Sequence, residues 1–315
     1  MKTYLALYLG ATKLLIGEVN TGGEILHSKR YETGYMNQTM ALSIIKRFLE
    51  NYITTEGWIN SGRPAVMGLG LTGQVDSEKG RWMGNDSKHI VSIPLSEKLA
   101  TTYDMPCYID NGINGAVRAV QLWGHGRDLK DFIYINIGEY IAVRFVKEGK
   151  LIRGNYLDEV EFGHQFAGTK IEIKQSYVGK DCISSIAGDE GFDRSARSLK
   201  NIYPTNLYIP DNEDIRVDVK EVIFLSQQGD KLCVNLINNA VEAITELIVD
   251  LYQNNSPEKI ILGGSQLSND FLYARIHEKL EKKNVNRFLK KNVLLTKFKP
   301  DYIGLVGAAA IAINE

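Results

Sequence analysis

The residues best suited to chemistry are a set of glycine turns and one acid–imidazole pair. Glycines follow short apolar segments at Gly10, Gly138 and Gly263-Gly264, and such turns let backbone N–H groups approach phosphate oxygens. Glu161 and His164 lie three residues apart, a pairing that can bind a polar ligand. Each feature also has a plainer interpretation, because a glycine pair after a strand is usually a structural turn and an isolated acid–imidazole pair is usually on the surface.

The other histidines and the three cysteines are scattered along the chain without metal-ligand spacing. An odd and widely spaced set of cysteines fits a reducing compartment better than a disulfide framework.

The segments around these turns alternate between strand and helix patterns. Tyr4–Gly10 is a nearly continuous apolar run that ends in glycine, which is typical of a buried strand, and two more strands follow at Lys13–Val19 and Glu24–Leu26. Apolar residues recur every three to four positions over residues 37–53, as on an amphipathic helix. The next expected elements are a strand at residues 65–71, a helix at 94–102 and a strand at 107–109.

The second half repeats this theme. Phe132–Gly138 is a strand ending in glycine, Ile141–Val146 is its expected hairpin partner, and a Glu148-Gly149 turn leads into a third strand at 150–152. A unit that recurs about 130 residues later indicates two similarly folded domains. Chance similarity of two hairpins is the alternative. Further on, the pattern predicts helices at residues 232–251, 270–280 and 304–313 and a strand at 259–262.

Composition narrows the class of protein. The chain has 315 residues, 44% hydrophobic and 24% charged, as expected of a soluble α/β protein with two domains. Its net charge of -1 gives no support for binding to nucleic acid or to an anionic membrane. We find no apolar run of the roughly 18 residues needed to span a bilayer, and no charged leader precedes the first strand. The cytoplasm is the expected location.

Several segments resemble the motifs of one family in their order and spacing. Residues 9–13 (LGATK) resemble the opening D-I-G-G-T-K turn, and residues 70–80 (GLTGQVDSEKG) resemble G-x-P-G-x-V-D-x-x-x-G. Residues 109–116 (IDNGINGA) resemble V-D-N-D-A-N-A-A. Residues 149–154 and 161–164 (GKLIRG, EFGH) resemble N-G-K-L-x-R-G followed by G-E-I-G-H. Residues 262–264 and 304–309 match later segments.

Together these segments resemble the ROK family of bacterial sugar kinases and NagC- and xylose-type repressors. The resemblance implies an α/β, actin-like (ribonuclease H-like) duplicated fold of two domains, with sugar and ATP meeting in an interdomain cleft. The expected domains are residues 1–115 and 116–302, with a C-terminal helix at 303–315 that packs back on the first.

The resemblance also implies that the catalytic base is missing. The second Asp of the D-N-D triplet is the family's general base, and this chain has Gly112 there. Asp110, two positions earlier, is a possible substitute, but residues two apart in a chain point elsewhere. General-base catalysis is typically worth about 10²–10⁴-fold in rate, so Gly112 alone predicts a kinase with a strongly reduced rate of phosphoryl transfer.

The phosphate-binding turns have also lost the residue types that the family uses there. Tyr8 stands at the family's opening acidic position, and Glu139–Arg144 replaces its T-G-x-G-G-G run. A carboxylate at Glu139 would repel a triphosphate, and Arg144 is expected to be solvated. The nucleotide-binding positions that the resemblance still assigns are Gly10, Thr12, Lys13, Gly138, Gly263 and Gly264. ATP with Mg²⁺ is therefore expected only if the chain is an active kinase.

The family's zinc cluster is also eroded, because its positions fall on Gln175, Tyr177 and Cys182, which leaves one cysteine of three. No zinc is expected, since one thiol and one imidazole do not make a tetrahedral site.

The sugar-binding positions are better kept. The resemblance assigns Glu161 and His164 to the sugar ring hydroxyls and places the other sugar-binding candidates at Gly73, Asn85, Asp110 and Asn111. The family's later sugar-contacting Glu aligns with Ser184, which puts the identity of the sugar in doubt.

Two functions follow as hypotheses. The first is a catalytically degenerate, carbohydrate-binding or regulatory, NagC-like protein, and the second is an ATP-dependent hexose or N-acetylhexosamine kinase with a rearranged site. Direct DNA binding is not expected, because Tyr4 already lies in the first strand and no helix-turn-helix precedes it. A small-molecule sugar is the expected partner and a homodimer the expected assembly.

Overall fold

The computed structural model describes residues 2–34, 38–58, 62–84, 92–153, 183–282 and 287–313. These residues form two compact units. Unit 1 holds the described residues up to Leu129 and those from Tyr302 onward, and unit 2 holds those from Lys130 to Asp301.

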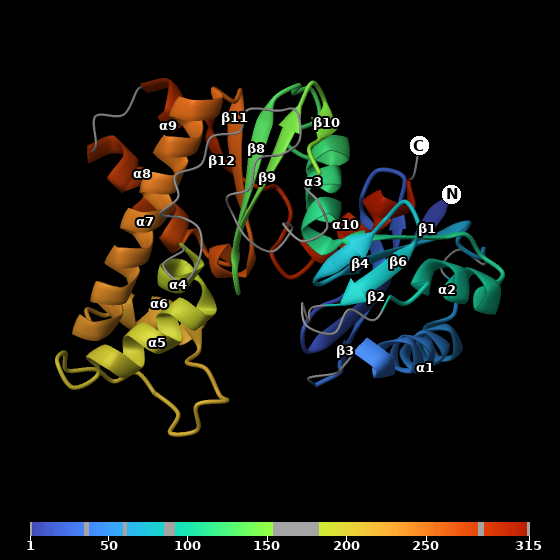
Figure 1. Ribbon diagram of the computed structural model, residues 1–315, viewed down its shortest axis with the longest axis horizontal. Helices are drawn as coiled ribbons and strands as arrows, with labels where there is room; N and C mark the ends of the chain where they lie inside the picture. Colours follow the sequence, from blue (N-terminus) through green and yellow to red (C-terminus); the bar gives the residue numbers. More distant parts are fainter. Residues whose placement is uncertain are drawn as a thin grey trace. The chain divides into compact units, whose positions relative to one another are not determined.

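Unit 1 is built on a five-stranded mixed sheet with the order β3-β2-β1-β4-β7 (Figure 1). The strands are β1 (Thr3–Leu9), β2 (Lys13–Asn20), β3 (Ile25–Glu32), β4 (Val66–Leu71) and β7 (Cys107–Asn111). β1 pairs parallel with β4, and β4 pairs parallel with β7. A separate hairpin joins β5 (Gln74–Asp76) to β6 (Arg81–Gly84).

Both faces of this sheet are covered, which is why its strands read as continuous apolar runs. The helices are α1 (Gln38–Glu56), α2 (Leu95–Tyr103), α3 (Gly112–Trp123) and α10 (Ile303–Ala312). Odd residues of β1, such as Leu7, belong to a core that includes Ile45 and Leu49 of α1. Even residues, such as Ala6, belong to a second core with Leu305 of α10.

Helix α10 approaches its neighbours closely because small residues line the contact. A Cβ atom at Gly68 of β4 would clash with the carbonyl oxygen of Ala308 and lie 2.8 Å from the backbone nitrogen of Ala312. One at Gly307 would lie 2.8 Å from the backbone of α3 at Gly115. The C-terminal helix is therefore an integral layer of unit 1.

Unit 2 repeats the arrangement with a sheet of order β10-β9-β8-β11-β12. Its strands are β8 (Phe132–Ile137), β9 (Ile141–Lys147), β10 (Lys150–Leu151), β11 (Lys259–Gly263) and β12 (Val293–Leu295). Its helices are α4 (Ser184–Ala187), α5 (Asp189–Leu199), α6 (Val219–Gln227), α7 (Lys231–Asn255), α8 (Asp270–Lys282) and α9 (Arg287–Asn292). Because each sheet begins with an antiparallel three-stranded meander and continues with two parallel strands, the predicted duplication is confirmed.

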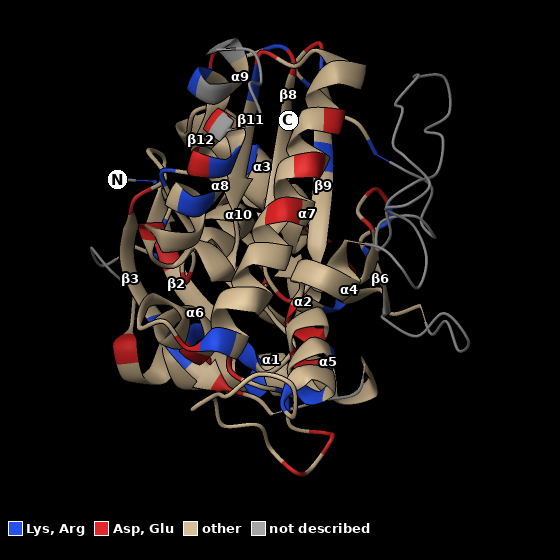
Figure 2. Ribbon diagram, turned by 90° about the vertical axis from the view of Figure 1, so that its left-hand side faces the viewer, with Lys and Arg blue, Asp and Glu red and all other residues tan. Residues whose placement is uncertain are grey.

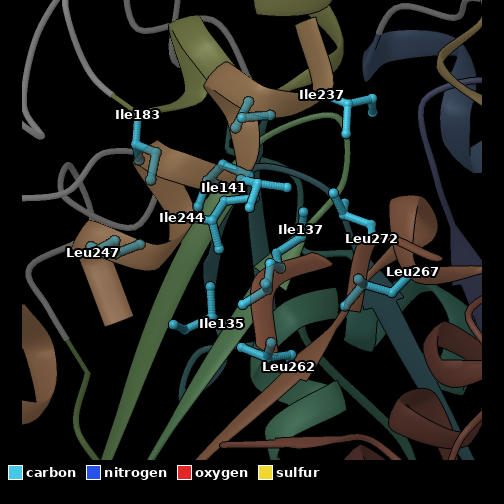
Figure 3. Close-up of a cluster of buried hydrophobic side chains, with 14 of the residues drawn as sticks. Ile135, Ile137, Ile141, Ile183, Ile237, Ile244, Leu247, Leu262, Leu267 and Leu272 are labelled. Atoms are coloured by element: carbon cyan, nitrogen blue, oxygen red, sulfur yellow. The ribbon is translucent and has the colours of Figure 1, made fainter. Parts of the chain in front are cut away.

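Aliphatic side chains from the sheet and from α7 form the core of unit 2. Figure 3 shows Ile135 and Ile137 of β8 and Leu262 of β11 beside Ile244 and Leu247 of α7. By length and composition α7 could cross a membrane, but just over half of its most apolar window is buried inside the unit. We interpret α7 as a core helix. Figure 2 shows acidic residues along α7 and residues of both signs along α8, and Glu242 of α7 forms an ion pair with Lys279 of α8.

Candidate functional site

The candidate sugar-binding residues of unit 1 lie where three parallel strands end. The register places Tyr8 of β1 beside Gly70 of β4, and Gly70 beside Asp110 of β7. The next row pairs Leu71 with Asn111. Ligands of open α/β sheets bind outside the carboxyl ends of the strands, so this edge is where a binding site is expected.

Asp110 is buried and engaged by its own chain. Its Oδ1 atom accepts hydrogen bonds from the backbone N–H of Asn111 at 2.7 Å and from Nδ2 of Asn114 at 3.1 Å. The side chain is only 1% exposed. Asp110 therefore holds the start of α3 against the end of β7.

Asn111 connects two loops at the same edge. Its Oδ1 accepts from the backbone N–H of Ile113 at 2.9 Å, which caps the N-terminus of α3. Its Nδ2 donates to the carbonyl oxygen of Gly73 at 2.9 Å. Gly73 has φ +85°, a backbone conformation that favours glycine. The predicted neighbours Gly73, Asp110 and Asn111 are thus brought together.

Gly112 is the first residue of α3, and it lies against the ring of Tyr8. A Cβ atom at Gly112 would lie 2.7 Å from Cε2 of Tyr8. Tyr8 is half-buried. The position that the resemblance assigns to a catalytic carboxylate therefore faces an aromatic ring.

The turn between β1 and β2 satisfies its own backbone. The N–H of Gly10 donates to the carbonyl oxygen of Lys13 at 2.9 Å, and the carbonyl oxygen of Thr12 accepts from the N–H of Thr33 at 2.9 Å. The Gly10 N–H group is consequently engaged within the turn.

In unit 2 the predicted nucleotide-side glycines pack against their own chain. Gly264 has φ +113°, and a Cβ atom there would clash with the backbone of Ile137. A Cβ atom at Gly263 would clash with the ring of Tyr134, and one at Gly138 would lie 2.9 Å from Oγ of Ser265. Close packing of β8 and the turn after it against β11 and the turn after that accounts for all three glycines.

Glu139, in the turn after Gly138, is paired with Arg216. The distance from Arg216 Nη1 to Glu139 Oε1 is 3.2 Å, and Glu190 lies 3.9 Å from the same guanidinium. Burial lowers the pKa of Arg216, but Glu139, Tyr140 and Glu190 together raise it by more, so that the pKa is raised overall. The backbone oxygen of Glu139 also accepts from the N–H of Asp189 at 3.2 Å.

Gln266, which no sequence motif singled out, holds this turn in place through its side-chain amide. Its Nε2 lies within hydrogen-bond distance of the carbonyl oxygens of Gly138 and Ala187 and of Oδ1 of Asp189, at 3.1, 3.0 and 2.9 Å. Burial raises the pKa of Asp189, although the hydrogen bond from Gln266 lowers it in part. Only the position of Gln266 directly after the Gly263–Ser265 turn could have signalled this role.

Arg144 and Ser184 make contacts that the sequence did not predict. Arg144 was expected to be solvated, and this is wrong: it is 9% exposed, and its Nη1 donates to the carbonyl oxygen of Val143 at 3.0 Å. The reason is that residues 141–146 of β9 are buried on both faces. Ser184, at the position of a sugar-contacting Glu, accepts from the N–H of Ile141 at 3.0 Å.

Three predicted sugar-binding residues, Asn85, Glu161 and His164, lie outside the described residues, and so do Gln175, Tyr177 and Cys182 of the zinc comparison. Among the residues that the structure describes, no three His, Cys, Asp or Glu side chains gather as a metal site.

Comparison with known proteins links this architecture to sugar kinases and repressors. The family model described as "ROK family" matches residues 4–315. The glucokinase of Thermotoga maritima is 23% identical over 309 residues, which cover 96% of this chain and 95% of that enzyme. The xylose repressor of Caldicellulosiruptor bescii is 20% identical over 251 residues, covering 79% of this chain but 62% of the repressor.

A solved structure gives the same result for the fold. The glucokinase from Streptomyces griseus, in complex with glucose and AMPPNP, superposes with a TM-score of 0.76 at 20% identity, covering 98% of this chain and 99% of that one. The predicted α/β, actin-like fold is thereby confirmed.

Proposed function

The chain belongs to the ROK family, and from that premise we propose that it is a carbohydrate-binding, regulatory member whose phosphoryl-transfer machinery has been lost. The relatives include both kinases and a repressor, so family membership alone leaves both functions open. The observation that carries the proposal is the state of Asp110 and Gly112. Gly112 has no side chain, and Asp110 is buried with Oδ1 occupied by two donors.

A general base must reach the proton that it removes, within hydrogen-bond distance of the attacking hydroxyl. Asp110 is committed to the N–H of Asn111 and to Asn114, and its burial argues against a direct approach by a sugar hydroxyl. This supports a structural role for Asp110 in place of catalysis.

The phosphate side supports the same proposal. The Glu139 carboxylate occupies the turn after Gly138 and is neutralised by Arg216, while Gly138 and Gly264 pack against Ser265 and Ile137. Because Arg216 offsets the charge of Glu139, the support from this turn comes from the close packing of its glycines and not from charge repulsion. We therefore propose that ATP with Mg²⁺ is not a ligand of the wild-type protein.

What remains is a sugar site. We propose that Asn85, Glu161 and His164 bind a sugar or sugar derivative, and that binding serves regulation. Asn111 and Gly73 are proposed to shape the edge of unit 1 through their mutual hydrogen bond. We also propose a cytoplasmic homodimer. The nearly neutral net charge gives no support for direct DNA binding.

The test is thermal shift with a panel of sugars and sugar phosphates, each with and without Mg-ATP, together with a coupled assay for ADP. Binding stabilises by RT ln(1 + [L]/Kd), so a ligand at a thousand times its Kd contributes about 4 kcal/mol. We expect a shift with a sugar, no added shift with Mg-ATP, and no sugar-dependent ADP.

The alternative is a hexose or N-acetylhexosamine kinase that uses Asp110. Sugar-dependent ADP formation that is abolished in Asp110→Asn, with the Mg-ATP shift retained in that variant, would establish the kinase and refute the degenerate site.

A further inference from the structure

The ring of Tyr8 lies in a cradle of glycines from four separate segments of unit 1. A Cβ atom at Gly112 would lie 2.7 Å from its Cε2, and one at Gly304 would lie 2.6 Å from its Cγ. One at Gly70 would lie 3.3 Å from Cδ2, and one at Gly10 would lie 3.5 Å from Cε1. The first two distances are too short for any real Cβ contact, so the ring and a side chain at either position exclude each other.

The backbone does not explain why these positions are glycine. The described glycines with positive φ do not include Gly70, Gly112 or Gly304. Gly112 begins α3, and Gly304 lies in α10, where glycine is less favourable than alanine. The feature that requires glycine at Gly112 and Gly304 is the space taken by the Tyr8 ring.

We propose that Tyr8 fills the volume that a side chain at position 112 would need, and that it contacts the ligand at this edge of the sheet. Tyr8 and Gly112 are then one interdependent pair, and an aspartate placed at Gly112 alone cannot regain the geometry of a base. The ligand contact rests on the proposed sugar-binding function, whereas the steric coupling does not.

Two observations support the ligand contact. Tyr8 is half-buried and lies in the same row as Asp110, at the carboxyl ends of β1, β4 and β7, where ligands of such sheets bind. Aromatic side chains are common in ligand pockets, because they supply a large apolar face together with a polar hydroxyl. The C–H face of a sugar ring has the matching chemistry.

The steric coupling is tested by a double-mutant cycle read as melting temperature. Gly112→Ala is expected to lower the melting temperature by several degrees in the wild-type background. In the Tyr8→Ala background, Gly112→Ala should leave the melting temperature nearly unchanged or raise it, because alanine favours a helix once the ring is gone. An equal drop in both backgrounds overturns the coupling.

Two controls keep the cycle decisive. Tyr8→Phe keeps the ring, so the Gly112→Ala penalty must persist in that background. Gly10→Ala adds a Cβ atom at an ordinary contact distance from the same ring, and its effect should be independent of Tyr8. If Tyr8→Ala does not fold, Tyr8→Val takes its place in the cycle with the same expectation.

The ligand contact is tested by calorimetric titration with whichever sugar of the panel stabilises the wild type. Tyr8→Ala should weaken binding at least tenfold and Tyr8→Phe by much less. The control is Tyr108→Ala, an exposed position on β7, which should leave affinity unchanged. Unchanged affinity in Tyr8→Ala refutes the contact. If no sugar stabilises the wild type, the proposed function fails together with the contact, and the melting cycle still decides the steric pair.

Discussion

The side chain of Asn111 spans the gap between two loops, with Nδ2 2.9 Å from the carbonyl oxygen of Gly73 and Oδ1 2.9 Å from the N–H of Ile113. One amide thereby fixes both the turn after β4 and the first turn of α3. Since both loops border the proposed sugar site, stability and binding are expected to depend on this residue in separable ways.

Asn111→Ala should lower the free energy of unfolding by about 1–2 kcal/mol, because it removes the helix cap. Asn111→Asp keeps an oxygen for Ile113 but places a second oxygen against the Gly73 carbonyl. We expect Asp to retain more stability than Ala while both lose the sugar-dependent thermal shift. Urea unfolding and thermal shift on the same samples measure the two effects, and equal stability loss in both variants would refute the capping role.

Gly68→Ala tests how closely α10 packs against β4. The new Cβ atom would clash with the carbonyl oxygen of Ala308, and the backbone on both sides offers no flexible side chain that could move. We expect a loss of about 3 kcal/mol or more in urea unfolding, at the severe end of overpacking. The control, Gly22→Ala, places its Cβ 3.2 Å from Asn20 Oδ1 in a surface turn, and should change stability by about 0.5 kcal/mol or less. A tolerated Gly68→Ala would mean that α10 does not pack this tightly.

The raised pKa of Asp189 predicts how the stability of the fold depends on pH. Burial raises the pKa of its carboxyl above the ordinary value, so the charged form is disfavoured in the folded state. The cost is present at neutral pH and is relieved as the pH falls through the folded-state pKa. Asp189→Asn should therefore gain stability at pH 7 relative to wild type, and that gain should shrink toward about pH 4. A gain that grows on acidification would reverse the sign and contradict the burial argument.

Cys107 and Cys233 should resist thiol reagents in the folded protein. Both are buried, and burial raises the pKa of each thiol to about 12, with Asp230 adding to the effect at Cys233. Because the thiolate is the reactive form, peptide mapping after alkylation at pH 8 should find both unlabelled until urea is added. Rapid labelling of either one without denaturant would show that its helix or strand opens.

The repeated meanders were predictable because their information is local. Apolar runs, glycine turns and the spacing of the two copies suffice to predict β1 to β3 and β8 to β10. Helix α3, in contrast, could not be predicted from local sequence alone. Gly112 and Gly115 in its first turn weaken the helix propensity, and the helix depends on the Asn111 cap and on packing against Gly307.

In the candidate site, too, some residues could be predicted from local motifs and others could not. Asp110, Asn111 and Gly73 could be selected from sequence motifs, whereas the meeting of Tyr8 with Gly304 joins residues almost 300 positions apart and leaves no local pattern. The burial of Arg144 was missed because its strand is covered on both faces, which a charged residue within the strand does not reveal.

Placing the last helix in the first unit has a consequence for synthesis on the ribosome. At roughly 5–20 residues per second, α10 is made roughly 15 to 60 seconds after β1. During that interval the face of β1 that carries Ala6 lacks its cover of Leu305 and Ala308, while every described residue of unit 2 is already translated. Nascent chains therefore pass through a stage in which the described part of unit 2 has been translated while unit 1 still lacks α10. Until α10 emerges, an apolar face of the first sheet is accessible to chaperones.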